Sequence, residues 1–161
     1  MSFQIVPLAA EAIAPLASLD DAALAERHAH RLTADAPQSY PCRVSLRYAE
    51  RGDALLLLNY AHQTAASPYR ASGPIFVRTG KPTAQFERGE VPDMLRGALL
   101  SVRGYGAEGW IEFADVAEGH ALEAKIARAF KSPGVDYLHL HYARHGCYVC
   151  RVNRAPGADA Q

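Results

Sequence analysis

Residues 135–152 read VDYLHLHYARHGCYVCRV, and this stretch predicts the last two strands of the fold. Apolar and aromatic residues dominate its two ends, from Val135 to Tyr142 and from Cys147 to Val152. Between them, Ala143-Arg144-His145-Gly146 has the composition of a hairpin turn. We therefore expect an antiparallel hairpin here.

The first strand of this hairpin places two histidines on one face. Successive side chains of a strand point to opposite faces, so His139 and His141 lie on the same side, ~6.6 Å apart along the chain. The leucines that alternate with them then point to the core. Three interpretations stay open: an ordinary solvated strand face, two metal ligands with Cys147 or Cys42 as a third, and acid–base catalysis.

The hairpin also contains a Cys-x-x-Cys pattern, Cys147 and Cys150. A redox pair or a zinc half-site needs a turn or a helix start that brings the two sulfurs together. In a strand, these two residues are ~10 Å apart and point to opposite faces. Tyr148 and Val149 favour a strand, so we expect ordinary strand cysteines. With Cys42 the chain has three cysteines, and an odd number in a reducing compartment argues for free thiols.

Outward from this hairpin, the sequence predicts five further strands and two or three helices. The expected strands are Arg43–Tyr48, Ala54–Tyr60, Ile75–Val77, Leu99–Tyr105 and Trp110–Val116. The expected helices are Leu19–Leu32 with Ser18 as its N-cap, His120–Phe130, and a short segment Val91–Arg96. The connections are too short for repeated crossover helices, which favours an α+β fold with one mainly antiparallel sheet of about seven strands. We expect a single domain over residues 1–154 and a frayed tail over residues 155–161.

Composition restricts the class of protein. The 161 residues include 17 Lys and Arg against 17 Asp and Glu, a balance that gives no electrostatic reason to expect nucleic acid or a membrane as partner. The first 19 residues lack Lys and Arg and contain Pro7 and Pro15, which makes them a poor signal peptide. We therefore expect a cytoplasmic protein.

Several blocks of the chain are distinctive as a set. They are Pro41-Cys42-Arg43-Val44-Ser45-Leu46, His62-Gln63 followed by residues 67–78, Leu100-Ser101-Val102-Arg103, and the terminal His-Gly-Cys-Tyr-Val-Cys-Arg-Val block. Together they resemble a family of small bacterial proteins catalogued as domain of unknown function 1203. The resemblance spans nearly the whole chain and implies one self-contained domain. It implies no activity, cofactor or catalytic residue.

The loop over residues 67–78 is the best candidate for ligand binding. Pro68 and Pro74 stiffen it, and Tyr69, Arg70 and Ser72 offer an aromatic face, a guanidinium fork and a hydroxyl. We expect these three residues, together with Arg144, to hold a small polar or anionic ligand beside His139 and His141, which would act as acid or base. This interpretation involves no cofactor and assigns no residue to a metal.

Two other functions remain as alternatives. One is an interaction module without catalysis, including a homodimer that uses a sheet face rich in Tyr and His. The other is a metal-binding protein that uses His139, His141 and a cysteine.

Overall fold

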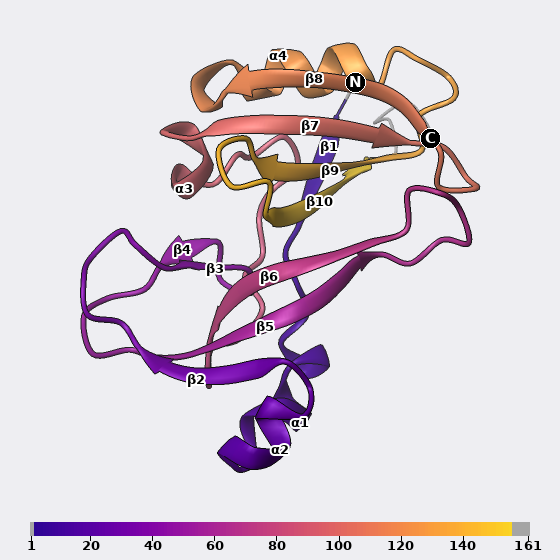
Figure 1. The fold of residues 1–161 in the computed structure, drawn as a ribbon. Coiled ribbons are helices and arrows are strands. Elements are labelled where there is room, and N and C mark those ends of the chain that lie inside the picture. Colours follow the sequence, from indigo (N-terminus) through magenta and orange to yellow (C-terminus); the bar gives the residue numbers. More distant parts are fainter. Residues whose placement is uncertain (1, 156–161) are drawn as a thin grey trace.

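The computed structural model describes residues 2–155, whose strands form two stacked five-stranded sheets (Figure 1). The upper sheet has the order β1-β10-β9-β7-β8 and is antiparallel throughout. Its strands are β1 (Phe3–Val6), β10 (Tyr148–Arg154), β9 (Tyr137–Tyr142), β7 (Leu99–Tyr105) and β8 (Ile111–Glu118). The lower sheet has the order β2-β5-β6-β3-β4, in which β3 and β6 pair in parallel. Its strands are β2 (Ala29–Thr33), β5 (Ala54–Gln63), β6 (Ala71–Arg78), β3 (Pro41–Cys42) and β4 (Arg47–Tyr48).

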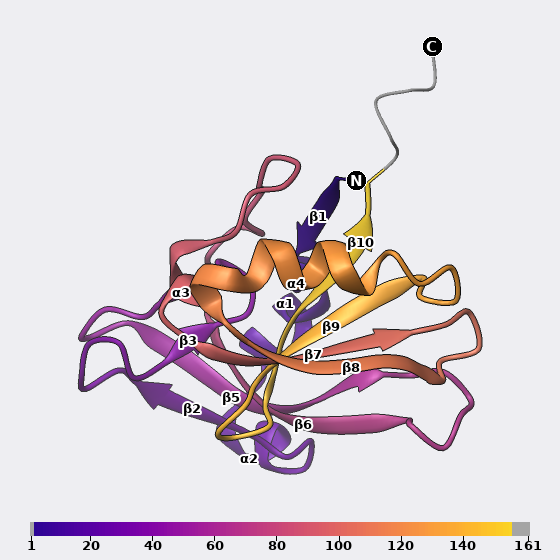
Figure 2. The same cartoon turned by 90° about the horizontal axis from the view of Figure 1, so that it is seen from above.

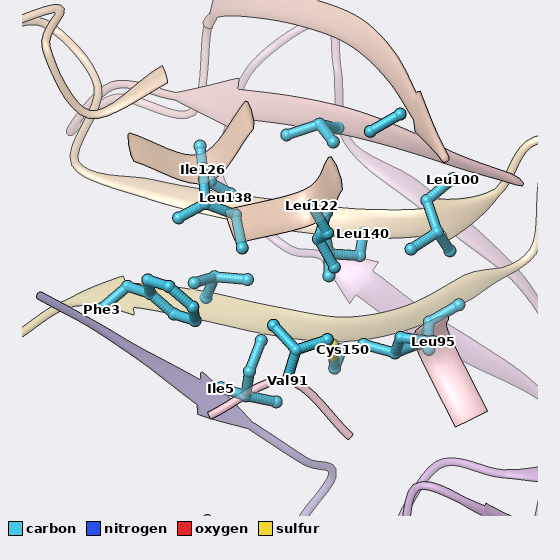
Figure 3. Close-up of a cluster of buried hydrophobic side chains, with 14 of the residues drawn as sticks. Phe3, Ile5, Val91, Leu95, Leu100, Leu122, Ile126, Leu138, Leu140 and Cys150 are labelled. Atoms are coloured by element: carbon cyan, nitrogen blue, oxygen red, sulfur yellow. The ribbon is translucent and has the colours of Figure 1, made fainter. Parts of the chain in front are cut away.

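Helix α4 (Leu122–Ala129) lies across the outer face of the upper sheet (Figure 2). Its Leu122 and Ile126, one turn apart, are fully buried and pack in one apolar cluster with Leu138 and Leu140 of β9 (Figure 3). Burying each such side chain contributes roughly 1.5–3 kcal/mol. This cluster fixes the orientation of β9, and with it the orientation of the side chains on the other face of that strand.

The remaining helices are short. They are η1 (Ala10–Ala12), α1 (Ala14–Ala17), α2 (Asp21–Ala25), α3 (Asp93–Arg96) and η2 (Gly119–Ala121). In Figure 1, α1 and α2 lie below the lower sheet, and a second apolar cluster joins this region to β5 and β6 through Ile13, Leu24, Leu56 and Ile75. Tyr148 of the upper sheet belongs to the same cluster, so it links the two sheets. No helix within residues 2–155 is long and apolar enough to span a membrane.

The structure confirms the α+β class and both predicted hairpins near the C-terminus. Strands β7 and β8 pair with Leu99 opposite Glu118, and β9 and β10 pair with His141 opposite Tyr148. The prediction of one sheet with about seven strands is wrong in number and arrangement, because the strands of the described chain divide into two sheets of five. The predicted tail over residues 155–161 falls outside the described residues apart from Ala155.

The predicted helix Leu19–Leu32 is also wrong. Helix α2 ends at Ala25, His28 adopts a left-handed φ of 52°, and strand β2 begins at Ala29 and pairs with β5. Leu24, His28 and Leu32, whose four-residue spacing favoured the helix, do not form an apolar face, because only Leu24 is buried and Leu32 is 37% exposed. The N-cap is Asp20, whose Oδ1 accepts a hydrogen bond from the Ala23 amide at 2.8 Å.

In the segment predicted as the strand Arg43–Tyr48, residues 43–46 form a turn between β3 and β4, and only Arg47–Tyr48 are in a strand, β4. Leu46 has a positive φ of 47°, and its amide donates to the Cys42 carbonyl at 2.9 Å. The guanidinium of Arg43 is buried and stabilises the turn, donating to the carbonyls of Tyr148 and Pro41. Val44 and Leu46, whose alternation with polar residues favoured a strand, are therefore buried residues of a turn.

Gly119 leaves no room for a side chain. An added Cβ would lie 1.9 Å from the Leu95 carbonyl oxygen and 2.6 Å from that of Arg96, both of them backbone atoms at the end of α3. We expect Gly119→Ala to lower the free energy of unfolding by about 1–3 kcal/mol, as overpacking does. Gly97→Ala is the matched control, because Gly97 has a φ of −92° and a Cβ there meets nothing within 4 Å. Urea unfolding followed by circular dichroism measures the free energy of unfolding of both variants. Equal losses of stability in the two would contradict the close packing at Gly119.

Candidate functional site

Three histidines meet between the two sheets. His139 and His141 lie on the face of β9 that points away from α4, and His62 comes from β5 of the lower sheet. The ring centroids of His62 and His141 are 4.9 Å apart, and those of His62 and His139 are 5.9 Å apart. One ring nitrogen from each histidine lies within 4.8 Å of the other two. His139 and His141 are 2% and 0% exposed, so this face is covered and is not the solvated strand face that the sequence left open.

A bulge in β5 brings His62 into this cluster. The pairing of β5 with β6 shifts between Ala61 and Gln63, so His62 is the extra residue. Because of the bulge, two successive side chains reach the upper sheet. His62 meets the rings of β9, and the amide of Gln63 donates to the hydroxyl of Tyr137 at 2.9 Å.

The histidines have buried nitrogens without partners. Six buried side-chain polar atoms in the described chain lack a hydrogen-bond partner, and three of them are His62 Nδ1, His139 Nδ1 and His141 Nε2. Native proteins satisfy most buried polar groups, so such a concentration at one place needs an explanation. His141 Nδ1 lies 2.9 Å from the Gly146 carbonyl oxygen. Because a carbonyl only accepts, Nδ1 carries the proton and Nε2 presents a lone pair.

Burial keeps these imidazoles neutral. It lowers the pKa of His139 to about 3 and that of His141 to about 4, and it lowers the pKa of His62 as well. Desolvation of the charged ring is the main cause, and the nearby positive charge of Arg103 adds to it in all three cases. At neutral pH the rings are therefore uncharged lone-pair donors. A general base that works near pH 7 needs a pKa close to 7, which His139 and His141 do not have.

Tyr148 forms one wall of the cluster. Its ring is parallel to that of His62, with centroids 5.2 Å apart, and it meets His139 and His141 edge-on at 5.1 and 5.7 Å. A bulge in β10 allows this orientation, because the pairing with β9 shifts between Tyr148 and Cys150. After the bulge, Cys150 points to the outer apolar cluster, away from the histidines.

The structure does not bring the residues predicted to bind a ligand together in one site. Tyr69 packs edge-on against Trp110, beside the turn that follows β7, and Arg70 and Ser72 are exposed. Arg144 is exposed at the opposite end, where Ala143 donates to the carbonyl of Leu99 at the start of β7. Since β7 has seven residues, ~20 Å separates these two places. Of the predicted set, His139 and His141 lie together.

None of the cysteines belongs to the cluster that the described residues form. All three are free thiols, as the sequence predicted. Cys42 is buried in the lower apolar cluster, where its sulfur accepts from the amide of Arg78 at 3.2 Å. Cys147 lies beside the His145 carbonyl in the turn.

His62 is the residue that the sequence analysis missed. The predicted strand ended at Tyr60, whereas β5 continues to Gln63. The alternation of Tyr60 and His62 was a signal that the strand extends further. No sequence pattern places His62 against β9, because that contact joins two sheets across 77 residues of chain.

Comparison with known proteins identifies a family. A family model described as protein of unknown function (DUF1203) matches residues 39–154. The chain belongs to this family. The DUF1203 match includes all three histidines and leaves β1, α1, α2 and β2 outside it. No curated protein and no solved structure matches the chain.

The buried histidines make the stability of the folded protein depend on pH. Their pKa values are lower in the folded state than the usual 6.5, so the unfolded chain binds more protons below pH 6.5. We expect the stability to fall as the pH drops from 6.5 to about 4, by up to about 1.4 kcal/mol per pH unit for each histidine. Urea unfolding with a chelator present, between pH 7 and 4.5, measures this slope.

The control for this experiment is the double variant His139→Gln/His141→Gln, which keeps every other titrating group. Its stability should fall less steeply over the same range. The same slope in both proteins would show that these two rings do not bear the predicted low pKa values.

Proposed function

We propose that this protein binds one divalent transition-metal ion through His62, His139 and His141. The observation that carries the proposal is the convergence of three neutral imidazoles with unpartnered nitrogens from two different sheets. The hydrogen bond from His141 Nδ1 to the Gly146 carbonyl supports it further. Metal-bound histidines commonly donate their second nitrogen to a carbonyl, which fixes the ring and directs the other nitrogen to the ion.

The distances fit such a site after a small movement. Zinc–nitrogen bonds of ~2.0–2.1 Å in a tetrahedral site separate the ligand nitrogens by roughly 3.4 Å. The three nitrogens here lie within 4.8 Å of one another, so ring rotations that close up to about 1.4 Å suffice. His62 is only partly buried and has the most freedom to make this adjustment.

The donor set indicates the class of metal. Three imidazoles without a carboxylate suit Zn²⁺, Co²⁺, Ni²⁺, Cu²⁺ or Fe²⁺, and not Mg²⁺ or Ca²⁺, which prefer oxygen ligands. Three protein ligands also leave a fourth tetrahedral position for water or substrate, as catalytic zinc sites do. The proposal differs from the sequence-based alternative in its third ligand, which is His62 in place of a cysteine.

The ligand-binding function that the sequence favoured receives less support. It combined acid–base work by His139 and His141 with anion binding by Tyr69, Arg70, Ser72 and Arg144. The low pKa values of the two histidines suit metal binding better than proton transfer at neutral pH. The four other residues lie at two separate ends of β7, as described above.

A metal titration tests the proposal. We expect tag-free protein to bind one equivalent of Zn²⁺ or Co²⁺ in isothermal calorimetry. Metal at about 100 times its Kd stabilises a folded protein by about 2.7 kcal/mol, which for a chain of this length raises Tm by roughly 5–10 °C.

The variants His62→Gln, His139→Gln and His141→Gln should each lose most of this increase in Tm. His30→Gln is the matched control, because His30 is an exposed histidine on strand β2. Equal stabilisation of all four variants by metal, or no binding by the wild-type protein, would refute the site.

A further inference from the structure

Two arginines flank the histidine cluster. Arg103 on β7 and Arg151 on β10 are both directly opposite His139 in the register of the upper sheet, where the three strands run side by side (Figure 1). Residues directly opposite each other in antiparallel strands point to the same face. Both guanidinium groups therefore lie on the face that holds the histidines, on backbones ~9.6 Å apart with His139 between them.

Neighbouring side chains hold both arginines in place. Arg151 Nε donates to Asn153 Oδ1 at 2.6 Å, and its guanidinium lies 3.8 Å from the centre of the Tyr137 ring. Arg103 Nε donates to Ser101 Oγ at 3.3 Å. These bonds use Nε, and Arg103 also donates to the hydroxyl of Tyr105. The remaining terminal N–H groups of each guanidinium can donate to an oxyanion.

Neither arginine forms an ion pair with an acidic residue of the described chain. Both side chains are half-buried, where charge is screened less than at an open surface. Both arginines flank His139 from the two neighbouring strands.

A bound divalent ion would add to this positive charge. The three histidines that would hold it are neutral, and the cluster contains no carboxylate. A metal ion and two guanidinium groups in a partly buried place then require an anion to balance them. A carboxylate or phosphate group meets this need, because one oxygen can bind the metal while the others accept from arginine.

We propose that Arg103 and Arg151 form an oxyanion subsite beside the metal, so that the ligand of this protein is a small molecule bearing a carboxylate or a phosphate. This inference rests on the proposed metal site. An oxygen of the carboxylate or phosphate would then take the fourth coordination position of the metal. Arg103 and Arg151, and not Arg70 and Arg144, would bind the anion.

Co²⁺-loaded protein provides the test, because the visible absorption of Co²⁺ changes when its fourth ligand changes. The probes are inorganic phosphate and acetate, titrated separately at constant ionic strength. We expect a saturable change with at least one of the two, and the probe that binds more tightly identifies the class of oxyanion.

Arg103→Met and Arg151→Met should each bind Co²⁺ like the wild type but weaken the anion ten- to a hundredfold, the usual effect of losing a hydrogen bond to a charged group. Arg103→Lys keeps the charge but loses the fork, and should bind the anion with intermediate affinity. Arg47→Met is the matched control on strand β4, where the arginine is exposed, and should match the wild type in both titrations.

The outcomes separate the two proposals. Co²⁺ binding without any response to either anion overturns the subsite and leaves the metal site standing. Anion binding that survives both Met substitutions, or is lost in Arg70→Met or Arg144→Met instead, also overturns the subsite. No Co²⁺ binding by the wild-type protein overturns the metal site and the subsite together.

Discussion

Strand β9 is buried on both faces. Its side chains point alternately to an apolar cluster on one face and to the histidine cluster on the other. Leu138 and Leu140 point to the cluster beneath α4, and His139 and His141 point to the lower sheet. A shift of one residue in the pairing of β9 would place imidazoles in the apolar cluster and leucines between the sheets. The leucines therefore fix the register of β9 through hydrophobic burial, and the register places the histidines.

The buried histidines are costly for the folded chain. An unsatisfied buried polar atom costs roughly 1–3 kcal/mol, and this cluster contains three of them. Apolar residues of similar size would fill the same space without that cost. Since proteins are stable by only about 5–15 kcal/mol, a cost of this size is substantial. A metal ion bound by these histidines would offset part of this cost, which supports our proposal that the cluster is a metal site.

The sequence predicted local structure better than it predicted contacts over long distances. The alternation of Leu and His in residues 138–141 correctly placed the two histidines on one face. Alternation does not indicate what covers a face, so it could not distinguish a solvated strand face from one that a second sheet covers. His62 was missed because it enters through a bulge at the end of β5, and a bulge breaks the pattern that strand prediction relies on. The helix expected over residues 19–32 failed because pairing of β2 with β5 outweighed a weak local propensity.

X-ray absorption at the zinc edge of zinc-loaded protein tests the central claim most directly, because it reports which atoms bind the metal. The proposed site gives three imidazole nitrogens at ~2.0–2.1 Å, and no sulfur. In His62→Gln the number of imidazole ligands should fall. Sulfur at ~2.3 Å, or a shell that is unchanged in His62→Gln, would contradict the three-histidine site.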